Sequence, residues 1–346
     1  KVLAITGSNG KTTTKELVAA ILTRKYSVLA TTGNLNNHIG VPLTLLSLKN
    51  EEVAVVEMGA NHPGEIGQLA EIAAPDLGLI TNVGKAHLEG FGSLEGVLNA
   101  KTELYRFLAA HGGRAIIDGS DSMLMKIAVE TGVESLVTGK DSNLPVSGSI
   151  LQQSPFLEVD LTVDGDSHHL STQLVGAYNL QNVLLATAVG YQFGVPINDI
   201  IDALCSYTPD NQRSQLLQGK RNRIILDAYN ANPTSMREAI SGLLQYASSP
   251  TMLILGDMAE IGESSLEEHT ELVRWIGSLD IALVLLVGPM FKKATEPSSS
   301  VNVFSERKEV EAYLQMEKPE GFHILVKGSR IMELEKLTPF LADSIT

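Results

Sequence analysis

The sequence predicts an α/β protein in which a doubly wound, mostly parallel sheet is followed by a second, Rossmann-like α/β domain. Three observations lead to this fold class. Short apolar segments alternate with helical patterns along most of the chain, which is typical of parallel sheets covered by helices. A glycine-rich loop separates the first strand from the first helix. The chain has 346 residues with 44% hydrophobic content, enough to bury more than one core.

The first elements are a strand, a loop and a helix. Residues 2–5 are apolar, and the loop that follows has glycines at positions 7 and 10. A helix is predicted over about 12–24, because its apolar residues recur at helical spacing. The helical pattern begins directly after the loop, so the loop joins a strand to the start of a helix.

Two short apolar segments, 53–57 and 77–81, then predict strands buried on both faces of a parallel sheet, and further strands are expected over 115–117 and 136–137. Around 140–175 the content of Ser, Pro and Gly increases, and residues 156–163 alternate apolar with polar side chains. This alternation predicts a small antiparallel addition to the sheet. A helix over about 179–193 is expected to follow.

Pro209, Asp210 and Asn211 mark a plausible domain boundary. Beyond it, apolar segments again alternate with helical patterns, which predicts the second α/β domain. We therefore expect a first domain over 1–210 and a second over 211–346. The strands expected in the second domain are 223–226, 252–255, 282–287 and 323–326.

The run from Ile5 to Thr13 predicts a phosphate-binding loop. Glycines allow consecutive backbone N–H groups to turn toward an anion, and the following helix directs the positive end of its dipole to the same point. Lys11 can reach the terminal phosphates of a nucleotide, and Thr12 can ligate Mg²⁺ through its hydroxyl. Ile5 stands where the usual loop has glycine, so this is a variant, and a glycine-rich turn opening an ordinary helix is the alternative. The residues expected to contact phosphate are Gly7, Ser8, Asn9, Gly10, Lys11, Thr12 and Thr13.

Glu57 and His87 are candidate metal ligands. Each follows or ends a predicted strand, which places both at the carboxyl edge of a parallel sheet, where open α/β folds bind ligands. A carboxylate and an imidazole beside a bound triphosphate suit a second Mg²⁺. Each residue alone also fits a strand-end cap or an ordinary surface position, and their joint placement beside the loop favours the metal.

Lys101 stands in the middle of an apolar helical stripe that runs from Leu94 to Leu108. A charged ammonium there is costly unless it is paired, and burial favours the neutral amine. A neutral lysine amine can react with CO₂ to give a carbamate, which supplies a carboxylate-like ligand. The alternative is a lysine whose head reaches solvent along the apolar surface.

The composition excludes several classes of protein. The net charge of −14 argues against a nucleic-acid partner, which requires clustered Lys and Arg. No apolar run approaches the roughly 20 residues of a membrane span. The single Cys205 excludes an intramolecular disulfide framework, so a reducing cytoplasm is the expected compartment.

Taken together, these motifs resemble the Mur ligases, the ATP-dependent amide-bond-forming enzymes of peptidoglycan precursor synthesis. The strings follow one another over nearly the whole chain, and several of them are more specific than a phosphate loop alone. The matching strings are TGSNGKTTTKE (6–16), GNLNNHIGVPLTLL (33–46), VVEMGANHPGEI (55–66), TNVGKAHLEGFGS (81–93), NAK with Glu103 (99–103), GAYNLQN (176–182), DAYNANPTSM (227–236), LGDMAEIGE (255–263) and LVKGSR (325–330).

The resemblance implies an enzyme that joins D-alanyl-D-alanine to UDP-N-acetylmuramoyl-tripeptide (UDP-MurNAc-tripeptide and D-Ala-D-Ala below). ATP and Mg²⁺ would act through an acyl-phosphate intermediate. It further implies a cytoplasmic enzyme, expected to be a monomer, whose central and C-terminal domains make up this chain. The family's N-terminal uridine-nucleotide-binding domain is expected to be absent. Another Mur-type or folylpolyglutamate-type ligase is the alternative, and a non-catalytic nucleotide-regulated binding protein is a second one.

Residue by residue, the resemblance assigns roles to matching positions. Lys11 matches the phosphate lysine and Thr12 the Mg²⁺ hydroxyl, while Glu57 and His87 match ligands of a second Mg²⁺ and Lys101 the carbamylated lysine. The implied nucleotide contacts are Asn182, Arg213 and Asp227, although Tyr178 replaces a frequent histidine and Gln212 a usual glycine. The residues assigned to substrate handling are Asn34, Asn36, Asn37, Asn230, Asn232, Lys327, Ser329 and Arg330.

Overall fold

The computed structural model describes residues 1–153, 155–247, 250–296 and 301–342, and these residues form two compact units. The first unit comprises 1–152, 157–173 and 178–207, and the second comprises 153–156, 174–177 and 208–346. Each unit is described separately below.

The first unit is built on a twisted sheet whose strand order is β2-β3-β1-β4-β5-β6-β7-β8-β9 in its described residues. Neighbouring strands are parallel from β2 to β7, whereas β7, β8 and β9 pair antiparallel. The strands are β1 (Val2–Thr6), β2 (Val28–Ala30), β3 (Val53–Glu57), β4 (Leu77–Ile80), β5 (Arg114–Asp118), β6 (Glu134–Gly139), β7 (Val146–Gln152), β8 (Glu158–Val163) and β9 (Asp166–Ser171).

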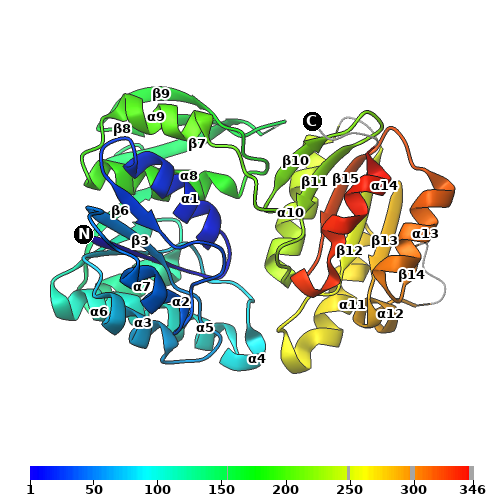
Figure 1. The fold of residues 1–346 in the computed structure, drawn as a ribbon, viewed down its shortest axis with the longest axis horizontal. Coiled ribbons are helices and arrows are strands. Elements are labelled where there is room, and N and C mark those ends of the chain that lie inside the picture. The colour runs from blue at the N-terminus through cyan, green and yellow to red at the C-terminus, as the bar shows by residue number, and fades with distance from the viewer. Residues whose placement is uncertain (154, 248–249, 297–300, 343–346) are drawn as a thin grey trace. The chain divides into compact units, whose positions relative to one another are not determined.

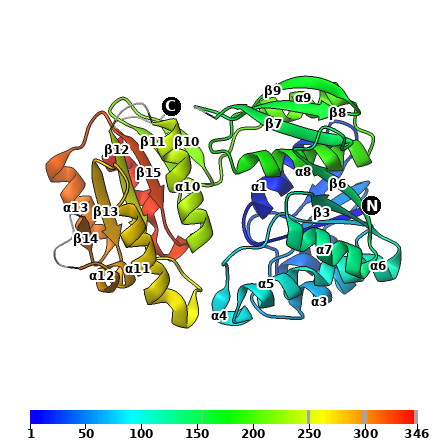
Figure 2. The same ribbon diagram turned by 180° about the vertical axis from the view of Figure 1, so that it is seen from behind.

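Helices cover both faces of this sheet (Figure 1). The helices α1 (Lys11–Leu22), α8 (Asn179–Gln192) and α9 (Ile197–Ser206) pack together on one face, and Figure 2 shows the same group from behind. The opposite face is covered by α2 (Gly40–Leu46), α3 (Glu65–Ala73), α4 (Leu88–Phe91), α5 (Leu94–Lys101), α6 (Glu103–His111) and α7 (Ser122–Thr131).

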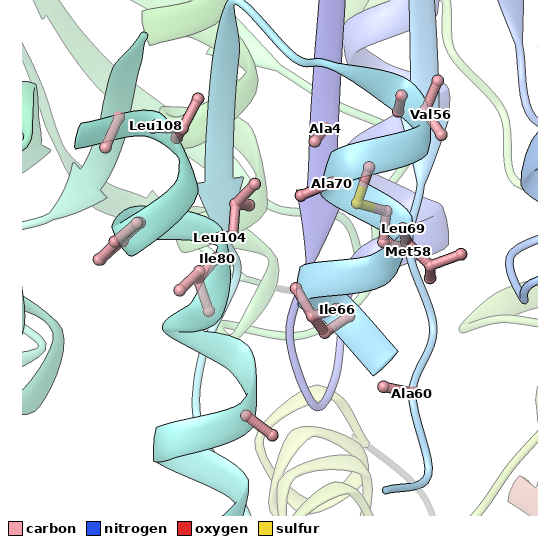
Figure 3. Close-up of a cluster of buried hydrophobic side chains, with 14 of the residues drawn as sticks. Ala4, Val56, Met58, Ala60, Ile66, Leu69, Ala70, Ile80, Leu104 and Leu108 are labelled. Atoms are coloured by element: carbon pink, nitrogen blue, oxygen red, sulfur yellow. The ribbon is translucent and has the colours of Figure 1, made fainter. Parts of the chain in front are cut away.

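Successive side chains of a strand point to opposite faces of the sheet, which explains why helices cover both faces. Ala4, Val56 and Ile80 point to the face covered by α3 and α6, where they meet Leu69 and Leu104 in one core cluster (Figure 3). Their neighbours in sequence are equally buried on the other face. Strands buried on both sides are therefore apolar throughout, as the sequence pattern predicted.

The second unit has a sheet of strand order β10-β11-β15-β12-β13-β14 in its described residues. Only β10 pairs antiparallel, and the other neighbours are parallel. The strands are β10 (Gln215–Gln218), β11 (Arg223–Asp227), β12 (Thr251–Gly256), β13 (Leu283–Val287), β14 (Asn302–Phe304) and β15 (His323–Lys327).

Two groups of helices cover the second sheet. The first group is α10 (Pro233–Tyr246), α11 (Ser265–Ile276), which follows the 3-10 turn η1 (Gly262–Ser264), and α12 (Pro289–Ala294). The second group, α13 (Arg307–Glu317), α14 (Thr338–Leu341) and the short turns η2 (Arg330–Met332) and η3 (Leu334–Leu337), includes residues of a separate core cluster with the strands. This arrangement leaves the carboxyl ends of β11, β15, β12 and β13 side by side at one edge.

The fold class predicted from the sequence is confirmed, including the antiparallel addition, with two local differences. The expected single stripe over 94–108 is divided at Thr102, whose hydroxyl donates to the carbonyls of Leu98 and Asn99 and ends α5 before α6 begins. The strands β2, β10 and β14 were not predicted, because three or four residues carry too little periodicity. Within the described residues, no helix has the length and apolar character that crossing a membrane requires.

Candidate active site

The predicted phosphate loop connects β1 to α1, with Gly10 immediately before the first helical residue. Gly7 and Gly10 have φ angles of 140° and 78°, which side chains disfavour, and a Cβ at Gly10 would meet Asn182 Oδ1 at 2.5 Å. The Lys11 ammonium donates to the carbonyls of Gly7 at 2.8 Å and Ser8 at 3.2 Å. Lys11 is thus folded back over the loop, where a bound phosphate can compete for its ammonium.

The loop after β4 holds the phosphate loop in place. Ser8 Oγ donates to the Gly84 carbonyl at 3.1 Å and accepts from the Gly84 N–H at 2.9 Å. Asn82 Oδ1 accepts from the Asn9 N–H at 2.9 Å, and the Thr81 hydroxyl donates to the Asn9 carbonyl. These bonds between two strand ends fix the conformation of the loop before any ligand arrives, which is the basis of preorganised anion binding.

Thr12 and Glu57 meet at the end of β3. The Thr12 hydroxyl donates to Glu57 Oε2 at 2.9 Å, and the Asn36 amide donates to Glu57 Oε1 at 2.8 Å. Glu57 is 2% exposed, and its N–H donates to the Thr31 hydroxyl at 3.0 Å. Hydroxyl and carboxylate oxygens are ligands that Mg²⁺ accepts, so this pair fits the divalent ion that the sequence predicted.

Lys101 is 1% exposed at the end of α5, so its head group does not reach solvent, the alternative that the apolar stripe had left open. Its ammonium makes a long contact of 3.5 Å with the Ala60 carbonyl and lies 5.4 Å from the centre of the Phe91 ring. Burial, followed by repulsion from Lys11, lowers the pKa of Lys101 to about 7. A large fraction of the amine is therefore neutral at physiological pH, which is the form that reacts with CO₂.

His87 precedes α4 with a φ angle of 53°, in the left-handed region. It is half-buried, and its role as a metal ligand stays a prediction. Among the described residues, no group of three or more His, Cys, Asp and Glu side chains is placed to hold a metal ion.

Asn182 lies beneath the phosphate loop. It is 4% exposed, its Oδ1 accepts from the Thr14 hydroxyl at 3.1 Å, and its amide donates to Asn179 Oδ1 at 2.8 Å. These contacts make Asn182 a support for the loop, and its predicted contact with adenine stays a prediction. Thr13 is half-buried on α1 and Asn34 is exposed. Asn37 accepts through Oδ1 from the N–H groups of the two residues around the start of α2, Ile39 and Gly40.

In the second unit, Asp227 and Lys327 form a buried ion pair between the ends of neighbouring strands. Lys327 is 2% exposed, its ammonium lies 2.6 Å from Asp227 Oδ2, and it donates to the Asn230 carbonyl at 3.1 Å. Asn230 itself is exposed. Asn232 is different, because its side chain caps α10 by accepting from the Ser235 N–H at 2.9 Å, which gives it a structural task.

Two predicted arginines share one aromatic ring. The guanidinium carbon of Arg213 lies 3.9 Å from the centre of the Tyr229 ring, and that of Arg330 lies 5.4 Å from it. Gln212, just before Arg213, has a φ of 58°, which explains why glycine suits this position. Ser329 is 2% exposed, whereas Arg330 is exposed, so only the latter presents its head group to solvent.

Three residues that organise these two regions were not predicted as site residues from the sequence. Lys15, 3% exposed, donates to the Thr31 carbonyl at 2.7 Å and so ties α1 to the loop that carries Asn36. Asp257 and His269 are buried at the carboxyl edge of the second sheet. A helical period provides a signal for two of them: Lys15 shares a face with Val18 and Leu22, and His269 with Leu272 and Ile276.

Comparisons with known proteins agree with this geometry. The family model of the Mur ligase middle domain matches residues 5–190, and that of the Mur ligase glutamate ligase domain matches 212–330. A UDP-N-acetylmuramoyl-tripeptide–D-alanyl-D-alanine ligase of Bacillus subtilis (strain 168) is 34% identical over 99% of this chain and 76% of its own length.

Two solved structures show the same fold. MurF from Acinetobacter baumannii superimposes with a TM-score of 0.88 at 35% identity, over 99% of this chain and 77% of that one. MurF ligase from Thermotoga maritima, solved in complex with ADP, gives 0.86 at 28% identity, over 99% and 79%. The chain belongs to the Mur ligase family and, within it, to the group of UDP-N-acetylmuramoyl-tripeptide–D-alanyl-D-alanine ligases.

Proposed function

We propose that this protein is an ATP-dependent ligase that forms an amide bond between the terminal carboxylate of UDP-MurNAc-tripeptide and the amine of D-Ala-D-Ala. One observation carries the proposal: the phosphate loop with Lys11 is braced beside the hydrogen-bonded pair Thr12 and Glu57. The family assignment supplies the substrates, since the relative from Bacillus subtilis is named for them.

The reaction proceeds in two balanced steps. An oxygen of the tripeptide carboxylate attacks the γ-phosphorus of ATP, the bond to the β-bridging oxygen breaks, and ADP and an acyl phosphate result. The amine of D-Ala-D-Ala then attacks the acyl carbon, an amide bond forms, and inorganic phosphate leaves while the nitrogen loses a proton. Phosphoryl transfer depends mainly on positioning and charge neutralisation, which Lys11 and the loop N–H groups provide.

Mg²⁺ suits the oxygen ligands at the end of β3, where we propose that Thr12, Glu57, His87 and a carbamate on Lys101 hold it. When bound, the ion would neutralise phosphate charge in the transition state. One feature of the chain supports a carbamate: Lys101 is buried with a pKa of about 7, so much of its amine is in the neutral form that reacts with CO₂.

In the second unit, we assign Arg213 and Asp227 to the nucleotide and the segment from Lys327 to Arg330 to substrate handling. Arg213 and Arg330 bring two permanently charged guanidinium groups to the ring of Tyr229. Such planar groups bind phosphate and carboxylate oxygens in pairs. The support for Arg330 is stronger than that for Ser329, because Arg330 is exposed and Ser329 is buried.

We further propose the domain assignment 1–210 for ATP binding and 211–346 for the Rossmann-like domain, a cytoplasmic location and a monomeric state. The chain separates into two compact units with a boundary near residue 208, and the two family models leave the boundary between residues 190 and 212. The single cysteine is unpaired, in keeping with a reducing compartment.

A panel of substrates separates this function from another Mur-type or a folylpolyglutamate-type ligase. The protein is incubated with Mg·ATP, one carboxylate substrate and one amine substrate, and the ligation product is identified by mass spectrometry. We expect ADP release only when UDP-MurNAc-tripeptide and D-Ala-D-Ala are both present. Ligation of glutamate to a folate would support the alternative ligase, and nucleotide binding without any ligation would support a regulatory binding protein.

A further inference from the structure

A continuous chain of hydrogen bonds runs through the second unit at the carboxyl edge of its sheet. The Ser329 hydroxyl donates to the Asp257 carbonyl at 2.7 Å, and the N–H of the same peptide group, at Met258, donates to His269 Nε2 at 3.1 Å. On the far side of the ring, His269 Nδ1 lies 2.6 Å from the Ser265 carbonyl. This hydrogen-bond chain joins the ends of β15 and β12 to the first turns of α11.

The position of each hydrogen in this hydrogen-bond chain follows from its partners. The Ser265 carbonyl can only accept, so Nδ1 of His269 carries a hydrogen, and the Met258 N–H can only donate, so Nε2 is an acceptor. The imidazole is therefore neutral with both nitrogens bonded, and it is 0% exposed. Hydrogen bonds that point in one direction polarise one another, which strengthens the whole chain.

Asp257 fastens the same peptide group from another side. Its carboxylate oxygens accept from the N–H groups of Met290 and Phe291 at 2.8 and 2.9 Å, at the first turn of α12. The Ser329 N–H donates to the Asp257 carbonyl at 3.2 Å, so Ser329 is held by both its backbone and its hydroxyl. The backbone immediately before Arg330 is consequently fixed.

Arg330 is the first exposed residue after this buried anchor, and its guanidinium lies 5.4 Å from the centre of the Tyr229 ring. A long, flexible side chain binds an anion well only when its root is held, because each rotamer that must be frozen costs free energy. The anchor at Ser329 and the ring of Tyr229 restrict the side chain at both ends.

We propose that His269 is a positioning residue which, through the Asp257–Met258 peptide group and Ser329, holds Arg330 ready to bind an anionic oxygen group of a substrate. The group is a carboxylate or a phosphate, since a guanidinium fork matches both. In the reaction proposed above, such groups occur on D-Ala-D-Ala as its C-terminal carboxylate, on ATP as its phosphates, and on UDP-MurNAc-tripeptide as its diphosphate and carboxylates. This assignment of a source rests on the proposed function, whereas the anchoring of Ser329 does not.

Three variants test the proposal. His269→Leu removes the link, whereas His269→Gln can place an amide oxygen where Nε2 accepts from Met258. His323→Leu is the matched control, because His323 is also a buried histidine, 4% exposed, but lies at the amino end of β15 on the opposite edge of the sheet. If both leucine variants lose a similar amount of folding stability, then a difference between them in hydrogen exchange or in KM comes from the link through His269 and not from general destabilisation.

The first readout is hydrogen exchange at the Ser329 amide, measured without substrates. We expect about tenfold faster exchange in His269→Leu, corresponding to about one net hydrogen bond, with near-normal exchange in His269→Gln and His323→Leu. Unchanged exchange at Ser329 in His269→Leu would overturn the proposal. This measurement needs no ligation, so its result stands even if the proposed function fails.

The second readout is the KM of each substrate in the whole gene product. We expect His269→Leu to raise one KM by about tenfold, the same one that Arg330→Gln raises, and the double variant to add little to either change. A rise in the KM of D-Ala-D-Ala that is lost when the C-terminal amide of the dipeptide replaces it identifies the dipeptide carboxylate. A rise in the KM of ATP identifies its phosphates, and a rise in the KM of UDP-MurNAc-tripeptide identifies the anionic groups of that substrate. Additive effects of the two substitutions, or equal effects in His323→Leu, would contradict the proposal.

Discussion

Thr12 and Glu57 are 45 positions apart in the sequence, and the hydroxyl of one donates to a carboxylate oxygen of the other at 2.9 Å. Thr12 is the second residue of α1, directly after the phosphate loop, and Glu57 ends the strand next to β1. The contact exists because two neighbouring parallel strands end at the same edge of the sheet. It joins a hydroxyl beside the phosphate loop to a buried carboxyl group, and both supply oxygen atoms of the kind that a divalent ion accepts.

Replacing Glu57 by Gln should preserve the hydrogen bond from Thr12 while removing the charge. We expect nucleotide turnover to fall and the concentration of Mg²⁺ at half-maximal rate to rise, because the amide oxygen is a weaker ligand. A Mg²⁺ titration of ADP release checks this. An unchanged Mg²⁺ requirement would show that Glu57 does not contribute to metal binding.

Lys11→Ala should lower turnover by roughly 100-fold or more, the usual loss when one preorganised charge is removed from a transition state. Folding should be little affected, because Lys11 is only half-buried. Lys49→Ala, at an exposed lysine of the same unit, is the control and should retain normal rates. Equal rates for the two variants would exclude Lys11 as the phosphate lysine.

Lys101→Ala should lose activity that added short-chain carboxylates partly restore, since they can occupy the position of the carbamate. In the unsubstituted protein, ¹³C-labelled bicarbonate should give a carbamate signal in the NMR spectrum when Mg·nucleotide is bound. The signal should be absent from the variant. Full activity of Lys101→Ala would refute the carbamate.

The burial of Lys101 also predicts a pH dependence of stability. The pKa is lowered from 10.5 to about 7 on folding, so between these values the unfolded chain binds more protons than the folded one. The free energy of unfolding should therefore rise with pH over this window, by at most about 1.4 kcal/mol per pH unit. Below about 7 both states are protonated, and the full cost of burying the ammonium remains.

Urea unfolding in buffers free of CO₂ measures this effect without interference from the carbamate. The difference in free energy between the protein and Lys101→Met isolates the contribution of Lys101, because other groups titrate in both. The difference should change with pH above 7 and be constant below it. A difference that is constant from pH 6 to pH 10 would show that the amine titrates normally.

Much of the first unit could be predicted from the sequence, because its signals are local. The strand Val53–Glu57 was predicted with the same bounds, because four apolar residues and the final Glu57 lie between polar turns. Helical spacing placed Lys101 on an apolar face but left its burial open, and Thr102 divides the expected helix. Local patterns of this kind depend only on residues within one or two turns.

The rest of the site depends on contacts between distant residues. Asn36 was predicted to handle substrate, but whether it bonds Glu57 depends on how the loop after β2 crosses the end of β3. The link from Ser329 to His269 joins residues 60 positions apart through a backbone peptide group, which has no signature in the sequence. Asn232 illustrates the converse, since its role as a helix cap follows from the proline after it.

Oxygen isotope transfer tests directly whether the chain makes an amide through an acyl phosphate. UDP-MurNAc-tripeptide labelled with ¹⁸O in its terminal carboxylate is ligated to D-Ala-D-Ala with unlabelled ATP, and the inorganic phosphate is analysed by mass spectrometry. We predict one ¹⁸O atom in the phosphate released and one in the new amide carbonyl. Unlabelled phosphate alongside normal amide formation would contradict the account.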